Sequence, residues 1–303
     1  MSDLTDASPS RVRTPPQHTL THMSSLRRAF TLVELLVVIA IIGILVGLAA
    51  PSLQAMRESS RRAGCQSRLT PIGMALQSYH DRWQHFPVGT VADSGPVQSE
   101  AAGNHHNWLG RLLDVLDQPI IASRIDRSIS VYDERNSAVL ELSYFGVKCP
   151  SDGRYPANTS SYVGFHHPTE KPINDTDHGV FLLNLPISRD EISDGLSNTA
   201  FVSEKLSRPD DLGWLSGTRA TLRNVGGGIR TPTGSFSQLT PSAVGSIGSR
   251  HPAGLHVLFG SGAIRFQTTQ TDQRILEQMV DRRDGQLPLE FQSMELQRRQ
   301  SIQ

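Results

Sequence analysis

An apolar run over residues 30–50 constrains this chain more than any other feature of its sequence. It is interrupted only by Thr31, Glu34 and glycines. A helix rises about 1.5 Å per residue, so a helix of this length covers about 30 Å, the thickness of a bilayer's hydrocarbon core. The sequence therefore predicts one transmembrane helix over residues 30–50, with membrane lipid as its partner.

The segment before this run, residues 1–29, is rich in Ser, Thr and Pro and has no apolar period, which predicts a disordered leader. Arg27 and Arg28 followed by an apolar run are also typical of a cleaved signal peptide. The run is longer than the roughly 7–15 apolar residues of such peptides, and Pro51 would directly follow the cleavage site. These two features favour a retained anchor.

Glu34 is the one acid inside the run. A carboxylate at the centre of a membrane helix costs on the order of 3 kcal/mol, and less near a helix end. Two interpretations follow: either Glu34 reaches the headgroups, or it pairs with a partner of opposite charge.

The segment "RRAFTLVELLVVIAIIG", residues 27–43, resembles the cleavage and methylation segment of type IV prepilins and of the pseudopilins of type II secretion systems. The resemblance implies that a prepilin peptidase cuts between Ala29 and Phe30 and that the new Phe30 amine is methylated. It also implies that Glu34 pairs with the Phe30 amine of a neighbouring pilin or pseudopilin subunit. The family has Gly before the cut, where this chain has Ala29.

The sequence of residues 51–83 predicts an amphipathic continuation of the same helix. Apolar residues recur there at spacings of three and four, which is typical of one helical face: Cys65, Leu69, Ile72, Leu76, Tyr79 and Trp83. We expect this stripe to pack on the following domain, and a coiled-coil partner helix is the alternative.

Residues 84–303 are rich in turn-forming residues, which predicts a loop-rich α+β domain with a mainly antiparallel sheet. Short apolar runs predict strands over residues 142–147, 161–165, 179–184 and 199–204, and a hairpin over 256–266. Helices are predicted over residues 104–117, ended by Pro119, and over 271–283, with Gly285 as its stop. The second would bury Ile275, Leu276, Met279 and Val280.

Several pieces of residues 27–285, such as "VKCPSD", "ISDGLSNTAFVSE" and "RHPAGLHVLFGSGAIRF", look like a planctomycete-type family of prepilin-like proteins, DUF1559. That family carries a His, nine further residues, and then Asp-Gly. Here His251 is followed after nine residues by Ser261 and Gly262, so the carboxylate is missing and the glycine is kept. Together the resemblances imply a pilin-like α+β fold, with the long helix packed on the sheet.

Cys65 and Cys149 fit no metal-binding spacing, and they either stay as buried thiols or form a disulfide. Histidine pairs at 105–106 and 166–167 are expected to be ordinary loop residues, and the Asp-Gly segments to be turns rather than calcium loops. Acidic and basic residues balance at 29 each, so no global field favours nucleic acid. No metal, cofactor or catalytic arrangement is predicted.

These features predict a pilin-like or pseudopilin-like structural subunit in the cytoplasmic membrane, with a single span and the C-terminal domain, residues 84–303, outside. The alternative is a monomeric binding module that the helix only tethers. An exported hydrolase is the third possibility.

Overall fold

The structure is a computed structural model that describes residues 31–152, 156, 158–176, 178–232 and 238–286. The predicted leader and Phe30 lie outside these residues. The chain divides between Leu53 and Gln54 into two compact units. In the described residues, the first unit is helical from Leu32 onward, and the second unit holds every strand.

Helix α1, Leu32–Trp83, begins in the first unit. Among the described residues it is the one helix that is long and apolar enough to cross a membrane, and its most apolar 18-residue window has a mean hydropathy of 3.0. None of that window is buried, and residues 31–50 are all exposed. A helix that is apolar on every side is stable only inside an apolar surrounding, as in a membrane.

In the second unit, the predicted apolar stripe of α1 packs into the core. Cys65 and Leu69 are fully buried, Tyr79 is 6% exposed, and Trp83 is partly buried at the edge of the core. The core-facing interpretation of this stripe is therefore confirmed. The helix ends where Gln84 adopts a φ of 63° and its backbone N donates to His80 O at 2.7 Å.

One five-stranded sheet follows, in the order β3-β1-β2-β4-β5. All neighbours pair antiparallel except β3, which runs parallel to β1. The strands are β1 Tyr162–His167, β2 Ala200–Glu204, β3 Leu222–Asn224, β4 Gly254–Phe259 and β5 Ile264–Thr268. The predicted α+β fold, a long helix packed on a mainly antiparallel sheet, is confirmed.

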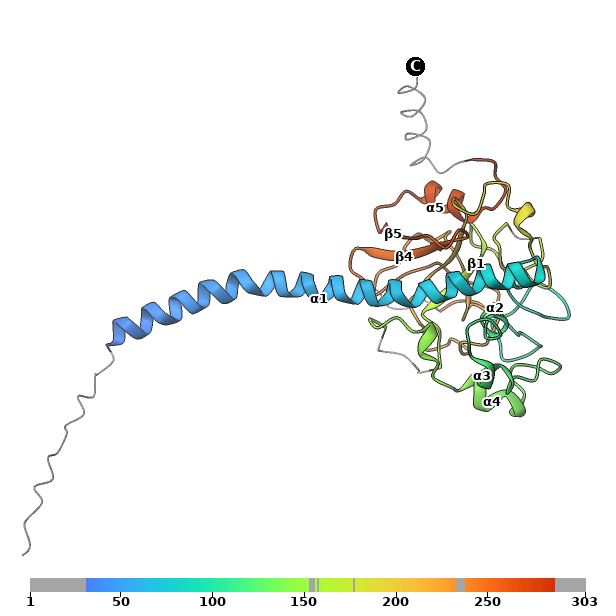
Figure 1. Cartoon of the computed structure of the whole chain (residues 1–303), viewed down its shortest axis with the longest axis horizontal. Coiled ribbons are helices and arrows are strands. Elements are labelled where there is room, and N and C mark those ends of the chain that lie inside the picture. Colours follow the sequence, from blue (N-terminus) through green and yellow to red (C-terminus); the bar gives the residue numbers. More distant parts are fainter. Residues whose placement is uncertain (1–30, 153–155, 157, 177, 233–237, 287–303) are drawn as a thin grey trace, which may run out of the picture. The chain divides into compact units, whose positions relative to one another are not determined.

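The sheet separates two apolar clusters, because successive side chains of a strand point to opposite faces. Along β4, Leu255, Val257 and Phe259 join the cluster around α5, Gln273–Val280, whereas Leu258 joins the larger cluster around α1. Figure 1 shows β4 and β5 between α5 and the C-terminal half of α1. The second unit is thus layered as helix, sheet and helix.

Two predicted strands are wrong. Residues 142–144 are irregular and lead into the 3-10 helix η1, Phe145–Val147, where the Val147 N donates to Tyr144 O at 3.2 Å. Residues 179–183 are buried and Asn184 is exposed, but the backbone amides of this stretch bond to separate segments: Gly179 N to His166 O, Phe181 N to Phe165 O, and Leu183 N to Asn174 O. Their apolar character reflects burial in the core and not a strand ladder.

The helices outside α1 are shorter than predicted. The predicted helix over residues 104–117 is limited to α2, Trp108–Leu112, and Pro119 starts α3, Pro119–Ala122, because proline suits the first turn of a helix. A further helix, α4, covers Glu134–Leu140. Helix α5 buries Leu276, Met279 and Val280 as predicted and Ile275 only partly, but it ends well before Gly285.

Candidate functional site

Glu34 lies in the first turn of α1 and is exposed. Its Oε2 accepts hydrogen bonds from the Thr31 backbone N at 2.9 Å and from Thr31 Oγ1 at 2.8 Å. Thr31 Oγ1 accepts in turn from the Glu34 backbone N at 3.2 Å, which completes a capping box. Glu34 therefore has a local partner, and its carboxylate stays at the surface where a second chain can reach it. Ala29 and Phe30, the predicted processing site, lie outside the described residues.

His251, the first residue of the family motif, lies in a buried cluster where α1 meets the loop before β4. Its side chain is fully buried, with Nδ1 2.7 Å from Glu58 Oε1 of α1. On the other side of the ring, Nε2 lies 3.4 Å from Glu204 Oε1 at the end of β2. Glu204 Oε2 is held by the His256 backbone N at 2.9 Å.

Charge complementarity stabilises this cluster. Burial acts to lower the pKa of His251, but the hydrogen bonds and charges of Glu204 and Glu58 outweigh it and raise that pKa above its ordinary value. Burial likewise acts to raise the pKa of Glu204, but hydrogen bonds from His251 and His256 hold it well below its usual range. The two carboxylates thus favour the protonated form of the ring that lies between them.

The cysteines complete the cluster. Cys65 and Cys149 form a disulfide across 84 positions of sequence, with their Cα atoms 5.1 Å apart. His251 Nε2 lies 3.2 Å from Cys65 Sγ and 3.8 Å from Cys149 Sγ. The disulfide links α1 covalently to the segment that follows η1.

These side chains also form a potential metal-ligand set that sequence spacing missed. One ligand atom each of Cys65, Cys149, Glu204 and His251 lies within 4.8 Å of all the others, and each residue is buried. Cysteines bind zinc as thiolates, and here the two sulfurs are bonded to each other. The four residues come from separate elements, so no local motif could reveal them.

A second buried carboxylate supports the same region. Asp152 Oδ2 accepts hydrogen bonds from Ser161 Oγ at 2.8 Å and Ser207 Oγ at 2.6 Å. Its Oδ1 lies 3.0 Å from Arg250 Nε, in the residue next to His251. The "VKCPSD" segment is thereby joined to the "RHPAG" segment by an ion pair, and to α1 by the disulfide.

The structure does not bring the rest of the family motif to this cluster. His251 precedes β4, whereas Ser261 and Gly262 lie in the turn after it, so the motif spans both ends of one strand. Gly262 has a φ of 87°, which suits a hairpin turn between β4 and β5. This turn packs on α1, where Gln77 Nε2 donates to Gly260 O.

The other histidines are only partly as predicted. His105 Nδ1 lies 3.0 Å from Tyr132 Oη, and His106 Nε2 lies 2.8 Å from Ile129 O. His166 and His167 belong to β1 and not to a loop, because the strand extends beyond its predicted end at residue 165.

The exposed apolar helix and its pilin-like arrangement with a sheet define a membrane-anchored, prepilin-like protein. The prokaryotic N-terminal methylation motif matches residues 24–50, which implies processing by a prepilin peptidase. The family described as "protein of unknown function (DUF1559)" matches residues 54–274, more than half of the chain, and the chain belongs to that family. No curated protein and no solved structure matches the sequence.

Proposed function

We propose that this protein is a pilin-like or pseudopilin-like structural subunit that assembles through its N-terminal helix. A prepilin peptidase cuts between Ala29 and Phe30, and the processed chain stays in the cytoplasmic membrane with its C-terminal domain outside. The observation that carries the proposal is the fully exposed apolar segment of α1 with a single carboxylate, Glu34, in its first turn.

The energetics of Glu34 favour an assembly contact. The capping hydrogen bonds from Thr31 satisfy one carboxylate oxygen but leave the negative charge uncompensated. The amine of Phe30 from a neighbouring chain would supply the opposite charge, and charge-assisted hydrogen bonds are the stronger kind. Two groups that are each costly in lipid would then neutralise one another.

The disulfide supports an exterior location for the second unit. Bonds of this kind form and persist in oxidising compartments and are rare in the cytosol. Cys65 is fully buried and Cys149 is 6% exposed, so this bond is part of the core of the second unit.

Variants of the full chain in its native membrane test the proposal. Glu34→Leu removes both the charge and the cap, whereas Glu34→Gln retains an amide oxygen for the cap and removes only the charge. Thr31→Ala removes the capping hydroxyl, which costs about 1 kcal/mol of helix stability, and keeps the charge. We expect both Glu34 variants to lose cross-linked oligomers with unchanged membrane insertion, and Thr31→Ala to keep them.

Oligomers that survive in Glu34→Gln but not in Glu34→Leu would show that the cap, and not the charge, matters. Unchanged complexes in both variants would contradict assembly and favour the monomeric tethered binding module. We also infer that the role is structural rather than enzymatic, and activity profiling of the full chain tests that inference.

A further inference from the structure

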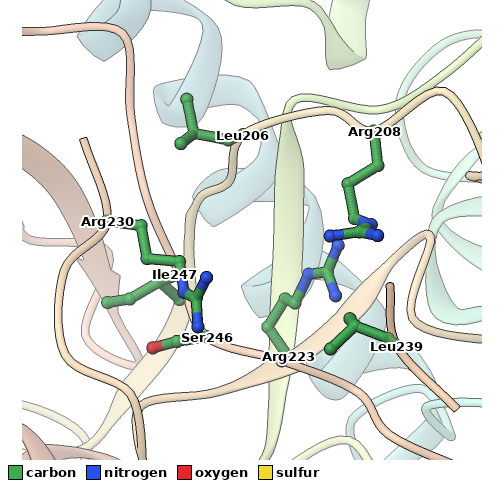
Figure 2. A pocket seen from close by; sticks show the side chains of 8 residues that line it. Leu206, Arg208, Arg223, Arg230, Leu239, Ser246 and Ile247 are labelled. Carbon is green, nitrogen blue, oxygen red and sulfur yellow. The ribbon is translucent and has the colours of Figure 1, made fainter. Parts of the chain in front are cut away.

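A small hollow in the second unit is lined by three arginines (Figure 2). Its volume is about 30 Å³, and one water needs roughly 10–15 Å³ on this measure. Arg208, Arg223 and Arg230 line it together with apolar side chains such as Leu206 and Ile247. Figure 2 shows the guanidinium groups of Arg208 and Arg223 pointing toward one another.

Asp211 pairs with Arg223, and a second cation shares it. It forms an ion pair with Lys205 and a longer one with Arg223, whose Nη2 lies 3.6 Å from Asp211 Oδ1. The side chains of Lys205 and Asp211 are fully buried, and that of Arg223 is 2% exposed.

Asp210 is shared in the same way. Its carboxylate lies 2.8 Å from Arg208 Nε and 2.8 Å from Arg219 Nη2. The side chains of these arginines are 8% and 7% exposed, whereas that of Asp210 is 43% exposed. Asp211 thus pairs with Lys205 and Arg223, and Asp210 pairs with Arg208 and Arg219.

Glu170, another carboxylate close to the hollow, is held by other donors. It accepts hydrogen bonds from Asn224 Nδ2 at 2.9 Å and from the backbone N of Val244 and Gly245 at 2.9 and 3.0 Å. The Glu170 carboxylate is thus hydrogen-bonded to neutral backbone amides and to one amide side chain.

Arg223 is buried and, within the described part of the chain, keeps one donor unused. One nitrogen donates to Val244 O, but among the described residues Arg223 Nε has no hydrogen-bond partner. Burial lowers the pKa of Arg223 to about 10, with Asp211 opposing the change and Arg208 and Arg219 adding to it. A buried cation with an unused donor is costly unless a negative group reaches it.

We propose that this hollow binds one oxyanion group, such as a phosphate or a carboxylate, with Arg223 Nε and the guanidinium groups of Arg208 and Arg230 as its donors. Planar guanidinium groups match the oxygen geometry of both anions. The apolar walls keep the local dielectric low, which strengthens each contact. This site is independent of Glu34 and of assembly.

Titration calorimetry on the full chain in detergent tests the site, with inorganic phosphate, sulfate, acetate and glycerol phosphate as probes. Arg230 is exposed, so Arg230→Gln should fold, and a thermal melt of the unliganded variant checks this. We expect saturable 1:1 binding by the native chain and a loss of about tenfold in affinity for Arg230→Gln. Arg230→Lys keeps the charge but not the planar fork, so its loss should be smaller.

Arg274→Gln in α5 is the matched control, because it removes the same charge from an exposed arginine outside the hollow. The affinity of the Arg274→Gln variant for each probe should equal that of the native chain. Tighter binding of glycerol phosphate than of inorganic phosphate would indicate the end group of a larger molecule, and the reverse would indicate a free ion. Absence of saturable binding for every probe, or equal weakening by Arg274→Gln, would overturn the proposal.

Discussion

His251 is the residue on which the charge balance at the α1 contact depends. Its ring lies between Glu58 and Glu204, and replacing it would leave the buried Glu204 without its cationic partner. Removing one member of a buried ion pair typically costs about 3–5 kcal/mol.

We predict that His251→Gln lowers the free energy of unfolding by about 3–5 kcal/mol near pH 6, and that this difference shrinks at higher pH. The folded-state pKa of His251 lies above its ordinary 6.5, so its stabilising charge is fully present below that pH and is lost as pH rises through the folded pKa. The folded-state pKa values of Glu58 and Glu204 lie below their ordinary 4.5, so their contribution is present above that pH and is lost as pH falls. The cluster therefore stabilises the fold most between pH 4.5 and 6.5.

Urea unfolding of the full chain in detergent, followed by the fluorescence of the buried Trp108 and Trp214, measures this difference. His178→Gln is the control, because His178 pairs with one carboxylate, Asp281, and its side chain is 43% exposed. Its effect should stay below about 1 kcal/mol. A pH-independent loss in His251→Gln would refute the charge-based account.

The turn after β4 contains two positions, Ser261 and Gly262, at which substitutions should have different effects on stability. Gly262→Ala should cost about 1–2 kcal/mol, because its φ of 87° strains any side chain although the space around it is open. Ser261→Asp, which introduces the carboxylate found in the family motif, should change stability by less than about 0.5 kcal/mol because Ser261 is exposed. Thermal melts of both variants measure these changes in stability. A large effect of Ser261→Asp would contradict the expectation for an exposed side chain.

At the scale of elements, α1 is joined to the sheet by contacts of different kinds. Arg62 stacks over the Phe266 ring of β5 at 4.2 Å, and Tyr162 Oη of β1 donates to Cys65 O at 3.1 Å. The disulfide between Cys65 and Cys149 adds a covalent link to the same helix.

We predict that Cys65→Ser combined with Cys149→Ser lowers the free energy of unfolding by about 2–4 kcal/mol, because the disulfide restricts a long loop of the unfolded chain. Reduction of the native chain should produce a similar loss. Denaturation curves with and without a thiol reductant provide the comparison. Equal stability of the reduced and oxidised chains would show that the bond does not stabilise the fold.

The sequence predicted the elements whose periodicity is strong. The stripe from Cys65 to Tyr79, the hairpin around Gly262 and the apolar face of α5 were all evident from spacing. Strand β3 was missed because its three residues, Leu222–Asn224, include two polar ones and carry no alternation. Residues 179–184 were mistaken for a strand because burial and strand pairing produce the same apolar run.

The buried cluster was not predictable in the same way. His251 was singled out by its resemblance to a motif, but its partners Glu58 and Glu204 lie far from it in the sequence. Ion pairs between distant segments leave no spacing signal, so only the fold could bring them together. The arginine hollow was missed for the same reason, since Arg208, Arg223 and Arg230 occupy separate segments.

For the whole molecule, the proposed function depends on the fate of the apolar helix. The described part of the first unit, residues 31–53, buries none of its most apolar window, so this surface needs lipid or another chain. The proposed assembly requires a retained helix with a free Phe30 amine, whereas removal of the helix would release a secreted domain.

Intact-mass analysis of the protein extracted from its native membrane distinguishes these outcomes most directly. We predict a chain that begins at Phe30 and carries one added methyl group, recovered from the membrane fraction. A soluble product that begins after Ala50, or a membrane product that still begins at Met1, would contradict processing and retention of the helix.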